Sequence, residues 1–319
     1  MDKELKKGAK TIVEQCLKVQ PHEHVVLVND GNDQELIRAL HQIIEEKANL
    51  DYFEYPQPDT SGEEPPQEVH EALIDADVAI APTVKSISHT DARKEACKAD
   101  TRVATLPGIN KKIWRTSLQA DYQKVEEITE GVYEMLKNTS RVKITTPSGT
   151  DITFDVEIDT YHTDTGILHE PGDFGNLPAG EPSGYPSNIH GTLAIDHFPF
   201  SPSAKRVEIE DELVVSVEDE DGTETSTLKQ TFEQNPNSRQ IAEFGFGTNP
   251  EATLIGNTLQ DEKVLGTVHI AFGDNCSYVP EGDERRNPCD IHWDTVCEDP
   301  TVYFDDELIL NEGRPEFLD

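Results

Sequence analysis

Two segments in the C-terminal half place a histidine or a carboxylate on a strand face that small residues keep open. Alternate residues of a strand share a face, so Glu243 in the run Ile241–Gly247 lies beside two glycines. In the run Val268–Gly273, His269 shares its face with an alanine and a glycine. Glycine weakens a strand, which is easier to understand where an ion or ligand approaches the backbone. Both segments therefore predict a binding site.

A third segment adds a histidine and an acid two residues apart. His292 and Asp294 share one face of an extended segment, so both side chains can reach one ion. Imidazole with carboxylate suits Zn, Mn, Co or Fe(II) better than Ca or Mg. Glu181, in a stretch rich in glycine and proline from 171 to 186, offers a further carboxylate on a predicted loop. Taken singly, each residue could equally be a hydrogen-bonded histidine or a solvated surface acid.

The N-terminal part alternates between strand-like and helical patterns. Asp33 and Thr90 stand where they can cap two of the helices, and a helix over Tyr122–Leu136 leads into the next region. No glycine-rich phosphate-binding motif follows the first strand. Such alternation predicts an α/β domain with a parallel sheet and helices on both faces. The predicted strands are 24–28, 50–55, 78–81 and 102–106.

From Arg141 onward the hydrophobic period changes to two, which is typical of strands. A hairpin is expected over 142–158, with further strand-like runs at 207–217, 267–272 and 301–304. We therefore expect residues 1–140 to form the α/β domain. Residues 141–319 are expected to form a β-rich α+β domain that binds metal.

The composition is strongly acidic, with 63 Asp and Glu against 27 Lys and Arg and a net charge of -36. The acids are spread along the whole chain, which favours a salt-adapted surface over an acidic tail. This charge argues against nucleic acid and anionic membranes as partners. No run of eighteen apolar residues and no apolar leader is present, so a cytoplasmic protein is expected. The five cysteines form an odd count without a CxxC pair, which argues against a disulfide framework.

The order and context of several motifs resemble metalloaminopeptidases of the aminopeptidase T and aminopeptidase S family. The motifs are 176–181 (NLPAGE), 241–249 (IAEFGFGTN), 261–263 (DEK), 266–273 (GTVHIAFG) and 292–294 (HWD). The resemblance implies two divalent ions, Zn, Co or Mn, that activate a water for peptide hydrolysis. It also implies a small peptide substrate, a homodimer, and Glu243 as a ligand that doubles as proton acceptor. The implied metal ligands are Glu181, Glu243, His269, His292 and Asp294.

One position departs from the aminopeptidase pattern. Cys276 stands where the family carries a tyrosine, and Tyr278, two residues further on, is the candidate replacement if the loop is rearranged.

The chain also resembles the compact iron-dependent 2,5-dihydroxypyridine dioxygenases, which cleave an aromatic ring. That resemblance implies a single Fe(II) held by His269, His292 and Asp294, with His89 approaching the active site. Because Glu181 and Glu243 suit a second metal, the peptidase is the favoured prediction. The dioxygenase is the alternative, and metal binding without catalysis is a third hypothesis.

Overall fold

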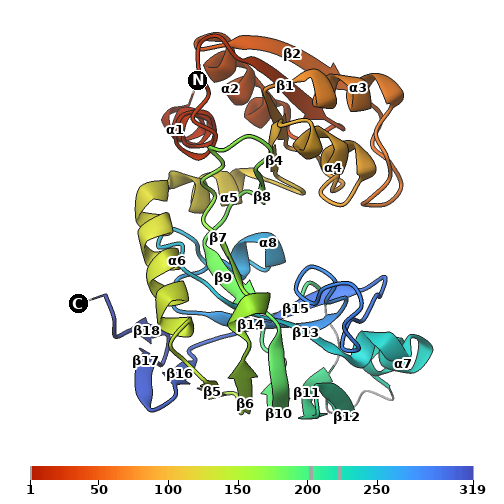
Figure 1. Cartoon of the computed structure of the whole chain (residues 1–319), viewed down its shortest axis with the longest axis vertical. Helices are drawn as coiled ribbons and strands as arrows, with labels where there is room; N and C mark the ends of the chain where they lie inside the picture. Colours follow the sequence, from red (N-terminus) through yellow and green to blue (C-terminus); the bar gives the residue numbers. More distant parts are fainter. Residues whose placement is uncertain (1, 201–203, 221–224, 319) are drawn as a thin grey trace. The chain divides into compact units, whose positions relative to one another are not determined.

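The computed structural model describes residues 2–200, 204–220 and 225–318, which fold into two units (Figure 1). The first unit comprises Met1–Glu127, Asp164–Ala179 and Pro250–Thr253. The second comprises Ile128–Thr163, Gly180–Asn249 and Leu254–Asp319. Each unit thus consists of three separate segments of the chain, whereas the sequence predicted a single boundary near residue 140. The chain returns to the first unit because a short strand, β8, joins the parallel sheet there.

The first unit contains a five-stranded parallel sheet in the order β2-β1-β3-β4-β8. Its strands are β1 His24–Asn29, β2 Asn49–Glu54, β3 Val78–Ala81, β4 Arg102–Thr105 and β8 Phe174–Asn176. Its helices are α1 Lys3–Lys10, a π-helical turn Thr11–Cys16, α2 Gln34–Glu45, α3 Gln67–Asp75, α4 Asp91–Lys98, α5 Lys111–Trp114 and the first part of α6 Tyr122–Leu136.

Local signals explain where these helices begin. The Asp33 side chain accepts a hydrogen bond from the backbone N–H of Glu35 and caps α2, and Thr90 caps α4.

Helices α3 and α4 lie side by side and pack with Val26 and Val28 on one face of the sheet (Figure 1). Val25 and Leu27 of β1 point to the opposite face of the sheet and are buried as well. The prediction of an α/β domain with a parallel sheet is confirmed.

The second unit contains two antiparallel sheets. An eight-stranded sheet has the order β12-β11-β10-β6-β5-β16-β17-β18, and a five-stranded sheet has the order β15-β14-β13-β9-β7 (Figure 1). The strands of the larger sheet are β5 Arg141–Thr145, β6 Asp151–Val156, β10 Pro186–Ala194, β11 Ala204–Glu210, β12 Leu213–Asp219, β16 Thr301–Phe304, β17 Glu307–Asn311 and β18 Arg314–Pro315. Those of the smaller sheet are β7 His162–Asp164, β9 Glu181–Gly184, β13 Ile241–Phe246, β14 Val268–Gly273 and β15 His292–Cys297. The helices are the rest of α6, α7 Thr227–Gln234 and α8 Thr258–Asp261.

The core of this unit lies between the two sheets. The ring of Phe244 on β13 lies 4.8 Å from that of Phe154 on β6, and Phe246 lies 6.3 Å from Phe304 on β16. The apolar side chains of β14 join the same core. One face of the five-stranded sheet is therefore committed to packing, which leaves the opposite face for chemistry. The prediction of a β-rich second domain is confirmed.

One predicted strand is in fact two. The run 207–217 forms a hairpin, because the chain reverses at Asp211 and Glu212 between β11 and β12. Both residues adopt positive φ angles, 47° and 69°, without a glycine to signal the turn.

All five cysteines are free thiols, so no disulfide supports the fold. Within the described part of the chain, no helix combines the length and apolar character needed to cross a membrane.

The excess of acidic residues predicts a fold whose stability rises with salt. The chain has 63 Asp and Glu residues but only 27 Lys and Arg residues. Even if every basic residue paired with one acid, more than half of the acids would stay without a basic partner. Since the Debye length falls to about 3 Å near 1 M salt, we expect the melting temperature to rise by at least about 5 °C between low and molar KCl. Differential scanning calorimetry over a KCl series measures this.

A parallel series in sucrose is the control, because sucrose favours compact states without screening charge. A melting temperature that stays constant or falls as KCl increases would contradict the salt-adapted surface.

Candidate metal centre

Neighbouring strands of the five-stranded sheet carry the predicted metal ligands. Strands β9, β13, β14 and β15 follow one another with antiparallel pairing, so segments far apart in the sequence lie side by side. Glu181, expected on a loop, is instead the first residue of β9 and is held by the pairing of that strand with β13. The other predicted ligands are Glu243 on β13, His269 on β14, and His292 and Asp294 on β15.

A glycine makes room for one of the imidazoles. Gly245 lies directly opposite His269 in the β13–β14 register. A Cβ atom built on Gly245 would lie 2.1 Å from Cε1 of the His269 ring, closer than any side chain allows. Gly245 therefore leaves on this strand face the space that the His269 imidazole occupies.

The carboxylates and imidazoles converge closely. His292 Nε2 lies 2.9 Å from Glu243 Oε2 and 3.6 Å from Asp294 Oδ1. His269 Nε2 lies 3.4 Å from Glu243 Oε1 and 3.5 Å from Glu181 Oε2. Among the described residues, three overlapping triplets have ligand atoms within 4.8 Å of one another. They are Glu181–Glu243–His269, Glu243–His292–Asp294 and Glu262–His269–Asp294.

Burial makes the charges of this cluster matter. Glu243 is 4% exposed and His269 is 1% exposed. Burial opposes the charged form of His269, yet the carboxylates of Glu243 and Glu181 raise its pKa to about 9. Burial also opposes ionisation of Glu243, but His269 and His292 hold the pKa of that carboxyl well below its usual range. The carboxylates around His269 and His292 therefore favour positive charge at this place, either on the imidazole rings or on a bound metal ion.

The hydrogen bonding of His292 suits a metal ligand. Its Nδ1 lies 2.7 Å from the backbone carbonyl oxygen of Asp274, which can only accept, so Nδ1 carries the proton. In the neutral ring Nε2 then presents a lone pair toward Glu243 and Asp294, both of them acceptors. Metal-binding histidines typically donate their second N–H in this way. The Glu181 Oε2 atom is also buried, with no hydrogen-bond partner among the described residues. This nitrogen and oxygen set fits a divalent transition metal.

Glu262 and Lys263 also belong to the cluster, although neither was among the site residues predicted from the sequence. Burial raises the pKa of Glu262 to about 8, while the Lys263 ammonium acts in the opposite direction. Lys263 Nζ contacts Glu181 Oε1 and lies 3.0 Å from Glu262 Oε1. The sequence feature that could have indicated these two residues is the Asp-Glu-Lys motif just before the strand that carries His269.

Tyr278 reaches the same region from the loop between β14 and β15. Its hydroxyl lies 3.1 Å from Ser183 Oγ on β9, and its ring stacks on His162 with centroids 5.0 Å apart. Burial, together with the charges of Glu243 and Glu181, raises the pKa of the phenol well above its usual value. Tyr278 is therefore a neutral hydroxyl beside the cluster.

His89, the remaining predicted site residue, lies in the first unit. It occupies the loop between β3 and α4, and its catalytic role stays a prediction.

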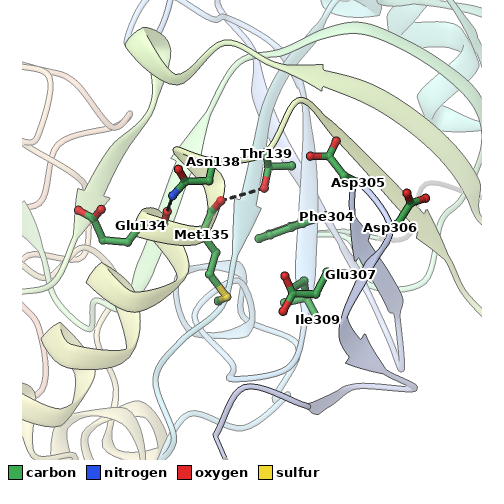
Figure 2. Close-up of a pocket in the computed structure, with 9 residues that line it drawn as sticks. All are labelled: Glu134, Met135, Asn138, Thr139, Phe304, Asp305, Asp306, Glu307 and Ile309. Carbon is green, nitrogen blue, oxygen red and sulfur yellow. Dashed lines mark hydrogen bonds between the residues drawn. The ribbon is translucent and has the colours of Figure 1, made fainter.

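A pocket of about 520 Å³ at the C-terminal end of α6 is separate from this chemistry (Figure 2). Two of its polar side chains bond to the main chain of α6: Thr139 donates to the Met135 carbonyl and Asn138 donates to that of Glu134. None of the predicted metal ligands lines it. The lining residues are Glu134, Met135, Asn138, Thr139, Phe304, Asp305, Asp306, Glu307 and Ile309.

Solved structures share this fold. The 2,5-dihydroxypyridine dioxygenase from Pseudomonas putida KT2440 is similar with a TM-score of 0.78 and 17% identity, over 98% of this chain and 96% of that one. Wild-type AmpT from Thermus thermophilus is similar with a TM-score of 0.68 and 15% identity, over 98% and 99%. No curated protein sequence matches the chain. The resemblance to both groups that the motifs suggested is confirmed.

The family assignment rests on a match along almost the whole chain. The model of the family described as NicX, 2,5-dihydroxypyridine 5,6-dioxygenase, matches residues 5–316. This range includes every residue of the three triplets. The chain belongs to the NicX, 2,5-dihydroxypyridine 5,6-dioxygenase, family.

Proposed function

We propose that the chain is an Fe(II)-dependent dioxygenase that opens the ring of a dihydroxypyridine-like aromatic compound. The observation that carries the proposal is the family match over residues 5–316, a range in which Asp294 lies in one triplet with His292 and in another with His269. These residues form the two-histidine, one-carboxylate set used by non-haem Fe(II) oxygenases. The family match favours the alternative that the sequence analysis had placed second.

The iron would supply open coordination positions for the substrate oxygens and for dioxygen, both of whose atoms enter the ring-opened product. The protein contributes the arrangement around these positions. The Glu243 carboxylate lies between the two imidazoles, with Oε1 3.4 Å from His269 Nε2 and Oε2 2.9 Å from His292 Nε2. The Asp274 carbonyl fixes the tautomer of His292. Tyr278 offers a neutral hydroxyl that can hydrogen-bond a substrate oxygen.

A metalloaminopeptidase is the second candidate, and one observation favours it. Glu243, His269 and Asp294 each belong to two of the three ligand triplets, an overlap that resembles the bridging ligands of a two-metal site. In that mechanism Glu243 would accept the proton of the attacking water. His89 has a role only under the dioxygenase proposal.

The direct test supplies the purified protein with Fe(II) and 2,5-dihydroxypyridine and follows oxygen uptake and loss of the ring absorbance. We expect one dioxygen consumed per ring opened. Removing a ligand in His292→Ala should lower activity more than about a hundredfold, because loss of a second-sphere partner alone costs about 10- to 100-fold.

His190→Ala is the matched control, because His190 is an exposed histidine in the same unit. Absence of oxygen uptake, together with hydrolysis of aminoacyl amides by the Zn, Co or Mn form, would replace this proposal with the second candidate.

Adding a methyl group opposite His269 should damage the centre without touching a ligand. In Gly245→Ala the new Cβ would lie 2.1 Å from the His269 ring, so the imidazole must move. We expect metal affinity to fall about 10- to 100-fold, as for other losses of ligand positioning. Isothermal titration with a divalent metal measures this.

Gly131→Ala in α6 is the control, since a Cβ there meets nothing within 4 Å. Native metal affinity in Gly245→Ala would show that the glycine does not serve His269.

Removing the Tyr278 hydroxyl should affect turnover more than metal binding. A hydrogen bond to a charged group contributes about 1.5–3 kcal/mol, so Tyr278→Phe should lower kcat by roughly 10- to 100-fold while the metal content stays unchanged. Steady-state kinetics and elemental analysis on the same samples measure both quantities. Tyr303→Phe, at a partly exposed tyrosine, is the control. An unchanged kcat in Tyr278→Phe would remove this residue from the site.

A further inference from the structure

Tyr278 reaches the carboxylate cluster from a loop that has no regular secondary structure. Residues 274–291, all of them described, contain neither a helix nor a strand. The backbone groups of such a loop lack the partners that a helix or sheet supplies, so other groups must bind them. The Asn275 carbonyl accepts hydrogen bonds from the N–H groups of Tyr278 and Val279, at 3.0 and 2.9 Å. These bonds fold residues 275–279 into one tight turn.

The Arg286 guanidinium binds this turn at two places. Its Nη1 atom donates to the carbonyl oxygen of Cys276, at 3.0 Å, and to that of Val279. Hydrogen bonds from a charged donor are roughly twice as strong as those between neutral groups. One cation therefore ties the main chain before Tyr278 to the main chain after it.

The Asn275 side chain fixes Arg286 in return. Asn275 is fully buried, its Nδ2 donates to the Arg285 carbonyl at 2.9 Å, and its Oδ1 accepts from the N–H of Asn287 at 2.7 Å. The main chain on both sides of Arg286 is thus held to the residue that begins the turn. The turn that carries Tyr278 and the arginine that binds it support each other.

Arg286 uses its charge differently from the arginine beside it. Arg285 pairs with the carboxylates of Asp283 and Glu157. Within the described part of the chain Arg286 forms no ion pair, although the chain has 63 acidic residues, and its hydrogen bonds go to the main chain. The contacts of Arg286 therefore serve the turn and not a surface ion pair.

The position of the turn decides where the Tyr278 side chain ends. The hydroxyl lies 3.1 Å from Ser183 Oγ, and the ring stacks on His162. Both contacts involve the side chain alone, so they leave the backbone of the turn to be fixed by Asn275 and Arg286.

We propose that Arg286 is a positioning residue that holds the turn 275–279 so that the Tyr278 hydroxyl stays beside the carboxylate cluster. The inference rests on the proposed function, in which this hydroxyl binds a substrate oxygen. A displacement of about 1 Å can lower a rate about a hundredfold. Loss of the Arg286 contacts should therefore affect turnover, although no hydrogen bond or ion pair joins Arg286 to a predicted metal ligand.

The first test is a double-mutant cycle on kcat for ring opening. Arg286→Met should lower kcat about 10- to 100-fold with the metal content unchanged. In the Tyr278→Phe background the same substitution should lower kcat by less than about twofold, because its target hydroxyl is already absent. Independent sites would instead multiply their two losses, within about twofold, and that result would overturn the inference.

The second test follows the backbone and needs no substrate. Hydrogen–deuterium exchange at the Tyr278 and Val279 amides should be at least about tenfold faster in Arg286→Met, because the bonds from a charged donor are lost. Exchange at the β13 amides should stay as in the wild type. If Arg286→Met does not fold, Arg286→Gln, which is shorter and uncharged, takes its place in both tests.

Arg285→Met is the matched control, since it removes the neighbouring positive charge and leaves the bonds to Cys276 and Val279 in place. It should keep kcat within about twofold of the wild type, the margin for independent sites. An equal loss of kcat in this variant would refute the specific role of Arg286.

The exchange result separates this inference from the proposed function. Wild-type exchange at Tyr278 and Val279 in a folded Arg286 variant would overturn the inference, whatever the substrate is. If the iron-loaded wild type leaves 2,5-dihydroxypyridine intact while exchange in the variant is faster, the proposed function fails and the role of Arg286 in holding the turn stands.

Discussion

Buried negative charge on one face of a sheet is the constraint that organises the second unit. Carboxylates are costly to bury unless cations or hydrogen bonds compensate them. In this cluster Glu181, Glu243, Glu262 and Asp294 each belong to a triplet of closely spaced ligand atoms. Lys263 compensates one side. The Nε2 atoms of the His269 and His292 imidazoles lie against the two oxygens of the Glu243 carboxylate. A divalent ion would complete this balance, and under the proposed function it would take part in oxygen chemistry.

The sandwich of two sheets makes such a cluster possible. Because side chains alternate along a strand, the phenylalanines of β13 and β14 fill the core while Glu243 and His269 point to the opposite face. Gly245 then gives the imidazole its space. Stability and chemistry are thus assigned to opposite faces of the same strands, so the core can hold the ligand-bearing backbone rigid.

Features that depend on local sequence could be predicted well. The caps at Asp33 and Thr90 depend on residues within one turn. The period of two predicted that Glu243 on β13 and His269 on β14 lie on the faces opposite the apolar side chains. Strand β8 could not be predicted, because three residues in a stretch rich in glycine and proline carry no periodic signal. Nor could the burial of Lys263, since its ion pair with Glu181 joins residues 82 positions apart. In a chain with so many acids, a lysine is expected at the surface.

The central claim is that one metal ion, bound by histidine nitrogen and carboxylate oxygen, occupies this cluster. X-ray absorption spectroscopy of the iron-loaded protein tests it most directly, because the spectrum reports ligand type and any neighbouring metal. The account predicts a shell of nitrogen and oxygen ligands with the scattering of two imidazoles and no metal neighbour. A metal–metal vector at about 3.5–4 Å, typical of two-metal hydrolases, would contradict it.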